Sequence, residues 1–238
     1  DMTTAIAAAA GACRTIPVPN AFTPEETVEL DVLLESNAPI VLRDITLLGC
    51  HIGLFLRDGG VLEQVRIERS TTNVLVSGGL LDVRASSFRP MAMLVMPLGL
   101  GRIALFGISP ARIQVSEDTV MELGDGLGIG VWTYGVGVQL ADLTINGGVS
   151  GFFLDGRSDN PSIQIGPNVT ISNLDAFSEQ DGINAILASQ VRVDGLDVTN
   201  VQGIGFGLKD CAAATVQNVS LSAADSALIF EDSTVDLG

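Results

Sequence analysis

The sequence predicts a right-handed, three-sided parallel β-helix, and three observations support this fold class. Apolar four-residue blocks recur every twenty positions, at 53–56, 73–76 and 93–96. A second apolar set recurs at the same spacing: Leu42, Ile45 and Leu47, then Leu62, Val65 and Ile67. The runs are short, alternate like strands and are rich in branched residues. Three short strands in about twenty residues form one coil, which buries its inner face only by stacking on its neighbours.

The repeat extends along most of the chain. Val83, Ser86 and Phe88 continue the second set, and Ile103, Phe106 and Ile108 follow twenty residues later. Residues 140–145 match residues 42–47 at a shift of 98, close to five coils. We therefore expect about nine coils, with residues 113–138 as one distorted coil. One solenoid over 39–238 is predicted, preceded by an N-terminal cap over 1–38.

Asp, Asn or Gln often ends the short link between the first and second strands of a coil, at Asp44, Gln64, Asp142, Asn168 and Asn218. Asn and Asp tolerate the left-handed backbone conformation and can hydrogen-bond to neighbouring amides. We expect these residues to form tight corners and, when stacked, to bond to one another.

The N-terminal segment has the features of a cap. Residues 1–11 are rich in alanine and end at a glycine, which predicts a short α-helix over the first coil. Pro17 and Pro19 then predict an extended edge segment, since proline is excluded from central strands. Cys13 and Cys50 are candidates for a disulfide that joins the cap to the solenoid; two buried thiols are the alternative.

Composition restricts the possible partners. The net charge is −16 and Lys209 is the only lysine, so a phosphate backbone would be repelled and no nucleic acid partner is expected. A strongly anionic polysaccharide is disfavoured too, unless calcium bridges it to the protein. No apolar run approaches the roughly 20 residues of a membrane span. The acidic surface suits an extracellular or cell-surface setting.

The opening TTAIAAAAGACRTIPVPNAF, followed by these coils, resembles the pectin-lyase-like β-helix superfamily, although the turn at 19–22 lacks the usual glycine. That resemblance covers nearly the whole chain at the level of fold. It implies relatives among polysaccharide lyases, glycoside hydrolases, epimerases and phage tailspikes. The Gly-His-Gly, Arg-Ile-Lys and Asp-Pro-His motifs of its enzymes are missing, and the single histidine, His51, lies in a turn. Fold alone does not transfer function.

The outward side of the third strand is apolar, at Phe55, Leu75, Val95 and Phe153. An exposed apolar row of this length marks an interface. We expect it to be covered by a protein partner, by a second copy of the chain, or by the chain's own segment 22–35.

Two inserted turns carry the remaining candidates for chemistry. Asp155, Arg157, Asp159, Glu179 and Asp181, with Lys209, form an alternative catalytic set in which carboxylates bind calcium or act as an acid pair beside a sugar bond. The same residues also suit ordinary turns. Trp132 and Tyr134, the only Trp and Tyr, form either a sugar-stacking platform or part of the packing of an irregular coil.

The sequence thus favours a non-enzymatic, secreted or cell-surface β-helix that acts as a rigid binding or assembly module. A carbohydrate-active enzyme that uses the inserted turns is the first alternative. A fragment of a tailspike-like homotrimer is the second.

Overall fold

The computed structural model describes residues 13–19, 27–91, 102–156, 161–175, 185–188, 190–223 and 226–238. These residues contain β-strands and turns but no helix. The cap helix expected over 1–11 lies outside the described residues. No helix of the described chain is long and apolar enough to cross a membrane.

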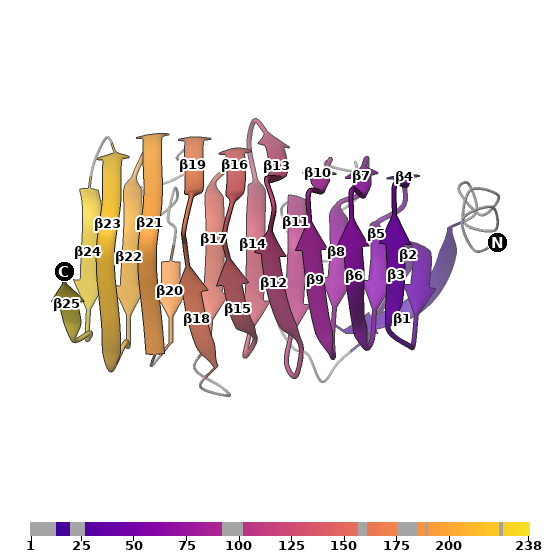
Figure 1. The fold of residues 1–238 in the computed structure, drawn as a ribbon. Coiled ribbons are helices and arrows are strands. Elements are labelled where there is room, and N and C mark those ends of the chain that lie inside the picture. The colour runs from indigo at the N-terminus through magenta and orange to yellow at the C-terminus, as the bar shows by residue number, and fades with distance from the viewer. Residues whose placement is uncertain are drawn as a thin grey trace.

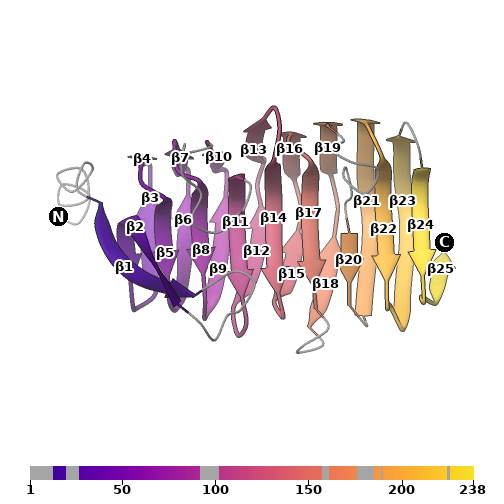
Figure 2. The same cartoon turned by 180° about the vertical axis from the view of Figure 1, so that it is seen from behind.

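The strands stack in three columns, which we call walls I, II and III in the order in which the chain visits them (Figures 1 and 2). Wall I contains β3 (Ile40–Arg43), β6 (Gly59–Glu63), β9 (Leu80–Arg84), β12 (Arg112–Ser116), β15 (Gly137–Leu140), β18 (Ser162–Ile165) and β25 (Val235–Leu237). Wall II contains β4 (Thr46–Leu48), β7 (Arg66–Glu68), β10 (Ser87–Arg89), β13 (Thr119–Gly124), β16 (Leu143–Gly147) and β19 (Val169–Leu174). The long strands β21 (Gln190–Val201) and β23 (Ala213–Ala223) turn the corner and belong to both walls.

Wall III contains β2 (Thr27–Ser36), β5 (Ile52–Leu56), β8 (Thr72–Val76), β11 (Arg102–Ile108), β14 (Gly128–Tyr134), β17 (Ser150–Asp155), β20 (Ala185–Leu187), β22 (Ile204–Lys209) and β24 (Ser226–Glu231). Neighbouring strands within each wall are parallel, as the repeat predicts. Among the described strands, only β1 (Arg14–Pro19) is antiparallel to its neighbour, and it pairs with β2 at the edge of wall III. The predicted edge position of Pro17 and Pro19 is therefore confirmed.

Equivalent apolar residues of successive coils lie over one another and fill the interior. The predicted pairs Leu42–Leu62, Leu47–Ile67 and Leu54–Val74 are all in register. They belong to one continuous buried core that runs through the described coils. Each coil thus buries its inner face against its neighbours, because a single coil has no other apolar surface to meet.

The coil number differs from the prediction. Eight coils contain strands in all three walls, whereas nine were expected. Wall III continues from β8 directly to β11, so Phe106 lies over Leu75. Twelve residues separate β10 from β11, where three separate β7 from β8, and the block at 93–96, for which the repeat predicts a third strand, lies outside the described residues. The shift of 98 residues therefore spans four coils rather than five, through Val83 and Val115.

The corner between walls I and II has the predicted backbone. Asp44, Gln64, Asp142, Asn168 and Asn218 all have a positive φ, between 46° and 56°. The amide of Asn168 donates to Asp142 in the coil before it, at 2.8 Å. Polar residues at these positions thus satisfy a strained backbone and link successive coils.

The next corner, between walls II and III, carries a ladder that the sequence analysis missed. The Asn173 amide donates to the side-chain oxygen of Asn146 at 2.7 Å, and Asn200 donates to Asn173 at 2.5 Å. Asn146 in turn donates to Glu122 at 2.9 Å. The 27-residue spacing of the three asparagines was visible in the sequence.

Candidate functional site

The N-terminal strand covers the beginning of the outward apolar row of wall III. Val18 of β1 and Leu30 of β2 form one buried cluster with Phe55, Leu75 and Phe106. Phe55 and Leu75 are 0% and 2% exposed. Figure 2 shows β1 and the start of β2 crossing the outside of the first coils. The chain therefore covers these two residues itself, with Leu30 of the expected segment 22–35 and also with β1, which precedes that segment, and they offer no surface to a partner.

Several contacts fasten this strand, which we call the β1 strap, to the solenoid. A disulfide joins Cys13, just before β1, to Cys50 in the turn before β5, with 5.9 Å between their Cα atoms. The Arg57 guanidinium lies 4.5 Å from the centre of the Phe55 ring. It also donates to Glu35 at 2.8 Å and to the carbonyl oxygen of Pro17 at 3.4 Å. The strap is thus held just before its first residue, through Cys13, and near its middle, at Pro17.

The apolar row continues past the strap as an aromatic row. The Trp132 ring lies 6.0 Å from Phe106 and 5.9 Å from Phe153, both edge-on. Tyr134 lies 5.9 Å from Trp132, and burial raises the pKa of its hydroxyl, while a hydrogen bond with Trp132 acts in the opposite direction. Trp132, Tyr134 and Phe153 are half-buried. Trp132 and Tyr134 therefore pack against neighbouring aromatic side chains, as the second of their two predicted roles requires. Val95 lies outside the described residues.

The alternative catalytic set is described only at Asp155 and Lys209. Both lie at the end of a wall III strand and share one column, with Leu187 between them. Two strand spacings, about 10 Å, therefore separate them. Lys209 donates to Glu231 at 2.7 Å, and this hydrogen bond raises its pKa. Arg157, Asp159, Glu179 and Asp181 lie outside the described residues. Within the described ranges, no group of three or more His, Cys, Asp or Glu side chains is placed to hold a metal such as calcium.

A groove lies along wall I, at the corner where the chain enters it from wall III. Its volume is about 840 Å³, and its floor is formed by the outward side chains of β12, β15 and β18. Gln114, Gln139 and Gln164 occupy the same position in these strands and lie directly over one another. Arg112 and Ser162 line the same groove. We call this surface the glutamine groove.

The three glutamine amides are unpaired within the described part of the chain. Gln139 and Gln164 are exposed, Gln114 is half-buried, and none of them hydrogen-bonds to another described residue. Strands in a wall are about 4.8 Å apart, so the amides form a regular row along the solenoid axis. The row presents both donors and acceptors to whatever enters the groove.

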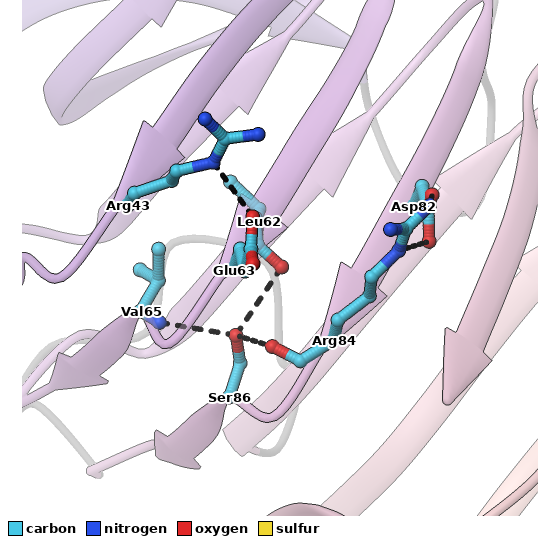
Figure 3. Close-up of polar contacts among 7 residues, drawn as sticks. All are labelled: Arg43, Leu62, Glu63, Val65, Asp82, Arg84 and Ser86. Carbon is cyan, nitrogen blue, oxygen red and sulfur yellow. Dashed lines mark hydrogen bonds and ion pairs between the residues drawn. The ribbon is translucent and has the colours of Figure 1, made fainter. Parts of the chain in front are cut away.

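The outward side chains of the first coils on the same wall behave differently, because they bond to one another. Figure 3 shows Arg43 donating to Glu63 across β3 and β6, at 2.6 Å, and Arg84 paired with Asp82. The buried hydroxyl of Ser86 donates to the carbonyl oxygen of Arg84 at 2.7 Å and accepts from the Val65 amide at 3.1 Å. The polar side chains on this part of the wall are bonded to other groups of the protein, whereas the glutamine amides of the groove are not.

The sequence analysis did not single out this row, because it placed Ile103, Phe106 and Ile108 in the second apolar set, whereas they belong to β11 of wall III. The signal was present, since the three glutamines are spaced 25 residues apart. Comparisons with known protein families, with characterised proteins and with solved structures find no match for this chain.

Proposed function

We propose that this protein is a non-enzymatic binding module that holds a neutral, linear polysaccharide along the glutamine groove. The observation that supports this function is the in-register row of unpaired amides at Gln114, Gln139 and Gln164. Amide side chains donate to and accept from sugar hydroxyls equally well. The row repeats at a fixed interval on a rigid wall, which suits a ligand that is itself a regular polymer.

The spacing favours a polysaccharide over a peptide. The groove offers one amide about every 4.8 Å, and a pyranose unit carries hydroxyl groups on both of its edges, so each unit of an extended chain can face an amide. An extended peptide presents equivalent groups on one side every two residues, about 6.7 Å apart. Because this interval differs from the spacing of the coils, its groups no longer lie opposite the amides within three coils.

Charge favours a neutral ligand and a binding role. The chain carries a net charge of −16, which opposes a polyanion. Arg112 is the one ionisable residue among the described residues that line the groove, so they provide neither a carboxylate pair nor an imidazole for acid–base chemistry. This lining supports the proposed non-enzymatic role of the groove. The disulfide between Cys13 and Cys50 suits a secreted or cell-surface location, where disulfides persist. The proposal depends on the stacked-coil fold and not on membership of the pectin-lyase-like superfamily.

The test measures the affinity of neutral oligosaccharides of increasing length, from β-linked glucan, mannan and xylan, by calorimetry. We expect affinity to rise with length until the oligomer spans the three glutamines and then to level off. Gln139→Ala should weaken binding about fivefold to tenfold, because a hydrogen bond contributes about 1 kcal/mol. Gln202→Ala, which changes an exposed glutamine in a turn away from the groove, is the matched control.

Three results would overturn the proposal. The first is that no neutral oligosaccharide binds, and the second is that Gln139→Ala and Gln202→Ala have the same effect on binding. The third is that the oligosaccharide is shortened during incubation. The last result would favour the carbohydrate-active enzyme, and we would then expect Asp155→Ala to stop the cleavage.

A further inference from the structure

A second surface, independent of the glutamine groove, gathers positive charge on this acidic protein. Arg69, Arg89 and Arg102 line one pocket of about 320 Å³. Arg69 follows β7, Arg89 ends β10 and Arg102 begins β11, so three separate segments bring them together. The pocket lies at the edge of wall II, near the start of β11 in wall III. We call it the arginine pocket.

These three guanidinium groups share one pocket and have no carboxylate partner in the described part of the chain. Arg43, Arg57, Arg66, Arg84 and Arg192 each form an ion pair with a carboxylate. Within the described residues, Arg69, Arg89 and Arg102 form none. Arg14 and Arg112 also form none there, but each lies singly, on β1 and β12, whereas the pocket gathers three unpaired guanidinium groups in one place.

The two carboxylates that line the pocket already have partners. Glu68 accepts from Arg66 at 2.7 Å, and Glu122 accepts from Asn146 at 2.9 Å. Neither forms an ion pair with the three arginines of the pocket. The guanidinium groups therefore keep their donors for a ligand, and a guanidinium presents them in a planar fork that fits an oxyanion.

The backbone around the pocket favours this arrangement. The Arg102 amide donates to the carbonyl oxygen of Leu127 at 2.7 Å, which fixes the start of its strand. Gly124 and Gly126 have a positive φ, and a Cβ on either would come within 3.2 Å and 3.4 Å of the Arg102 guanidinium. Arg69 itself has a φ of 61°, at the position where the first coil has Gly49 and later coils have Asn173 and Asn200. An arginine at this position carries a backbone cost that asparagine tolerates better, and such outliers gather at functional sites.

We infer that the arginine pocket is a binding site for a small oxyanion, a phosphate, sulfate or carboxylate group carried by a compact ligand. Two or three guanidinium groups can share its oxygens through charge-assisted hydrogen bonds. A polyanion does not fit, because the rest of the surface is strongly acidic. Beyond about 8 Å from the pocket, salt screens the arginines and the remaining acidic surface offers no attraction.

The test titrates the intact protein with inorganic phosphate, with sulfate and with a dicarboxylate such as oxalate, at constant ionic strength kept with chloride. Binding is followed by calorimetry and by the rise in melting temperature that a ligand specific for the folded state produces. The three anions distinguish a tetrahedral from a planar group. We expect saturable binding of at least one of them.

Arg89→Gln and Arg102→Gln should each weaken that binding about tenfold to a hundredfold, the effect of removing one hydrogen bond between charged groups. Arg14→Gln, which removes the same charge from an exposed position on β1, should leave it unchanged. Circular dichroism of each variant establishes that it is folded. The inference is overturned when no anion binds saturably, or when Arg14→Gln weakens binding as much as the two pocket variants.

Discussion

The β1 strap provides the sharpest test of how the fold protects its own apolar row. Replacing both Cys13 and Cys50 by alanine removes the disulfide and leaves every other contact of β1 in place. When β1 separates from β2 in the wild-type protein, the chain stays fixed at Cys13 and at Val32, where β2 begins to pair with β5. The separated segment is then a closed loop of about 20 residues. In the variant it is a free end.

The loop-closure relation gives the magnitude. Closing a loop of about 20 residues lowers its conformational entropy. The free energy of the open form is therefore about 3 kcal/mol higher with the disulfide than without it. The open form of the strap should therefore become about a hundredfold more populated in the double variant. The rest of the solenoid should be unaffected, because each coil depends chiefly on its nearest neighbours.

Amide hydrogen exchange measured by mass spectrometry tests this directly. We expect exchange at Thr15, Ile16 and Val18 to become about a hundredfold faster in the variant, and exchange in β14 to stay the same. Unchanged exchange in β1 would mean that the apolar cluster and Arg57 hold the strap without the disulfide. Equal acceleration in β14 would mean that the disulfide acts on global stability and that the strap is not a separate unit.

Two further predictions concern the corners and the last coils. Asn173→Ala should lower the free energy of unfolding by about 2 kcal/mol, because it loses two ladder hydrogen bonds and because alanine tolerates a φ of 58° less well than asparagine. Asn173→Gly should cost about 1 kcal/mol less, since glycine has no Cβ and adopts this φ freely, and equal losses in denaturant unfolding would refute the backbone argument. Hydrogen bonds from Asn218, Gln217 and Arg192 lower the pKa of Asp194, so its stabilising effect is present above the ordinary pKa of an aspartate and is lost as pH falls through the lowered value. Carbon-13 NMR of the Asp194 carboxyl group should show the lowered midpoint, and a midpoint at or above about 3.9 would contradict the stabilising effect of these three hydrogen bonds.

The inward residues were predictable because their pattern has a physical cause that is strictly periodic. Leu42, Leu47 and Leu54 each need an apolar partner one coil away, and only a repeat of about twenty residues supplies one. The corner residues Asp44 and Asn168 were predictable for a similar reason, since few residue types accept a positive φ.

The coil number was not predictable from period alone. Twelve residues separate β10 from β11, where three separate β7 from β8, and the longer link contains an apolar block at 93–96 that resembles a third strand. Only the pairing of β8 with β11 shows that the third strand of this coil begins at Arg102. The same link hid Gln114, because the sequence analysis placed Ile103, Phe106 and Ile108 in the second apolar set, whereas they lie in wall III.

The outward rows carry functional information only through comparison between coils. An exposed glutamine or arginine alone is ordinary, because water satisfies it at little cost. Here Arg43 and Arg84 of the early coils are paired with carboxylates, while the Gln139 amide and the Arg102 guanidinium, on equally rigid strands, are not. The stacked core fixes the spacing of all four side chains, so ordering a ligand against the unpaired ones costs the protein little conformational entropy. A rigid solenoid can therefore bind through individually weak contacts, provided that the ligand repeats in step with the coils or fits between three fixed donors.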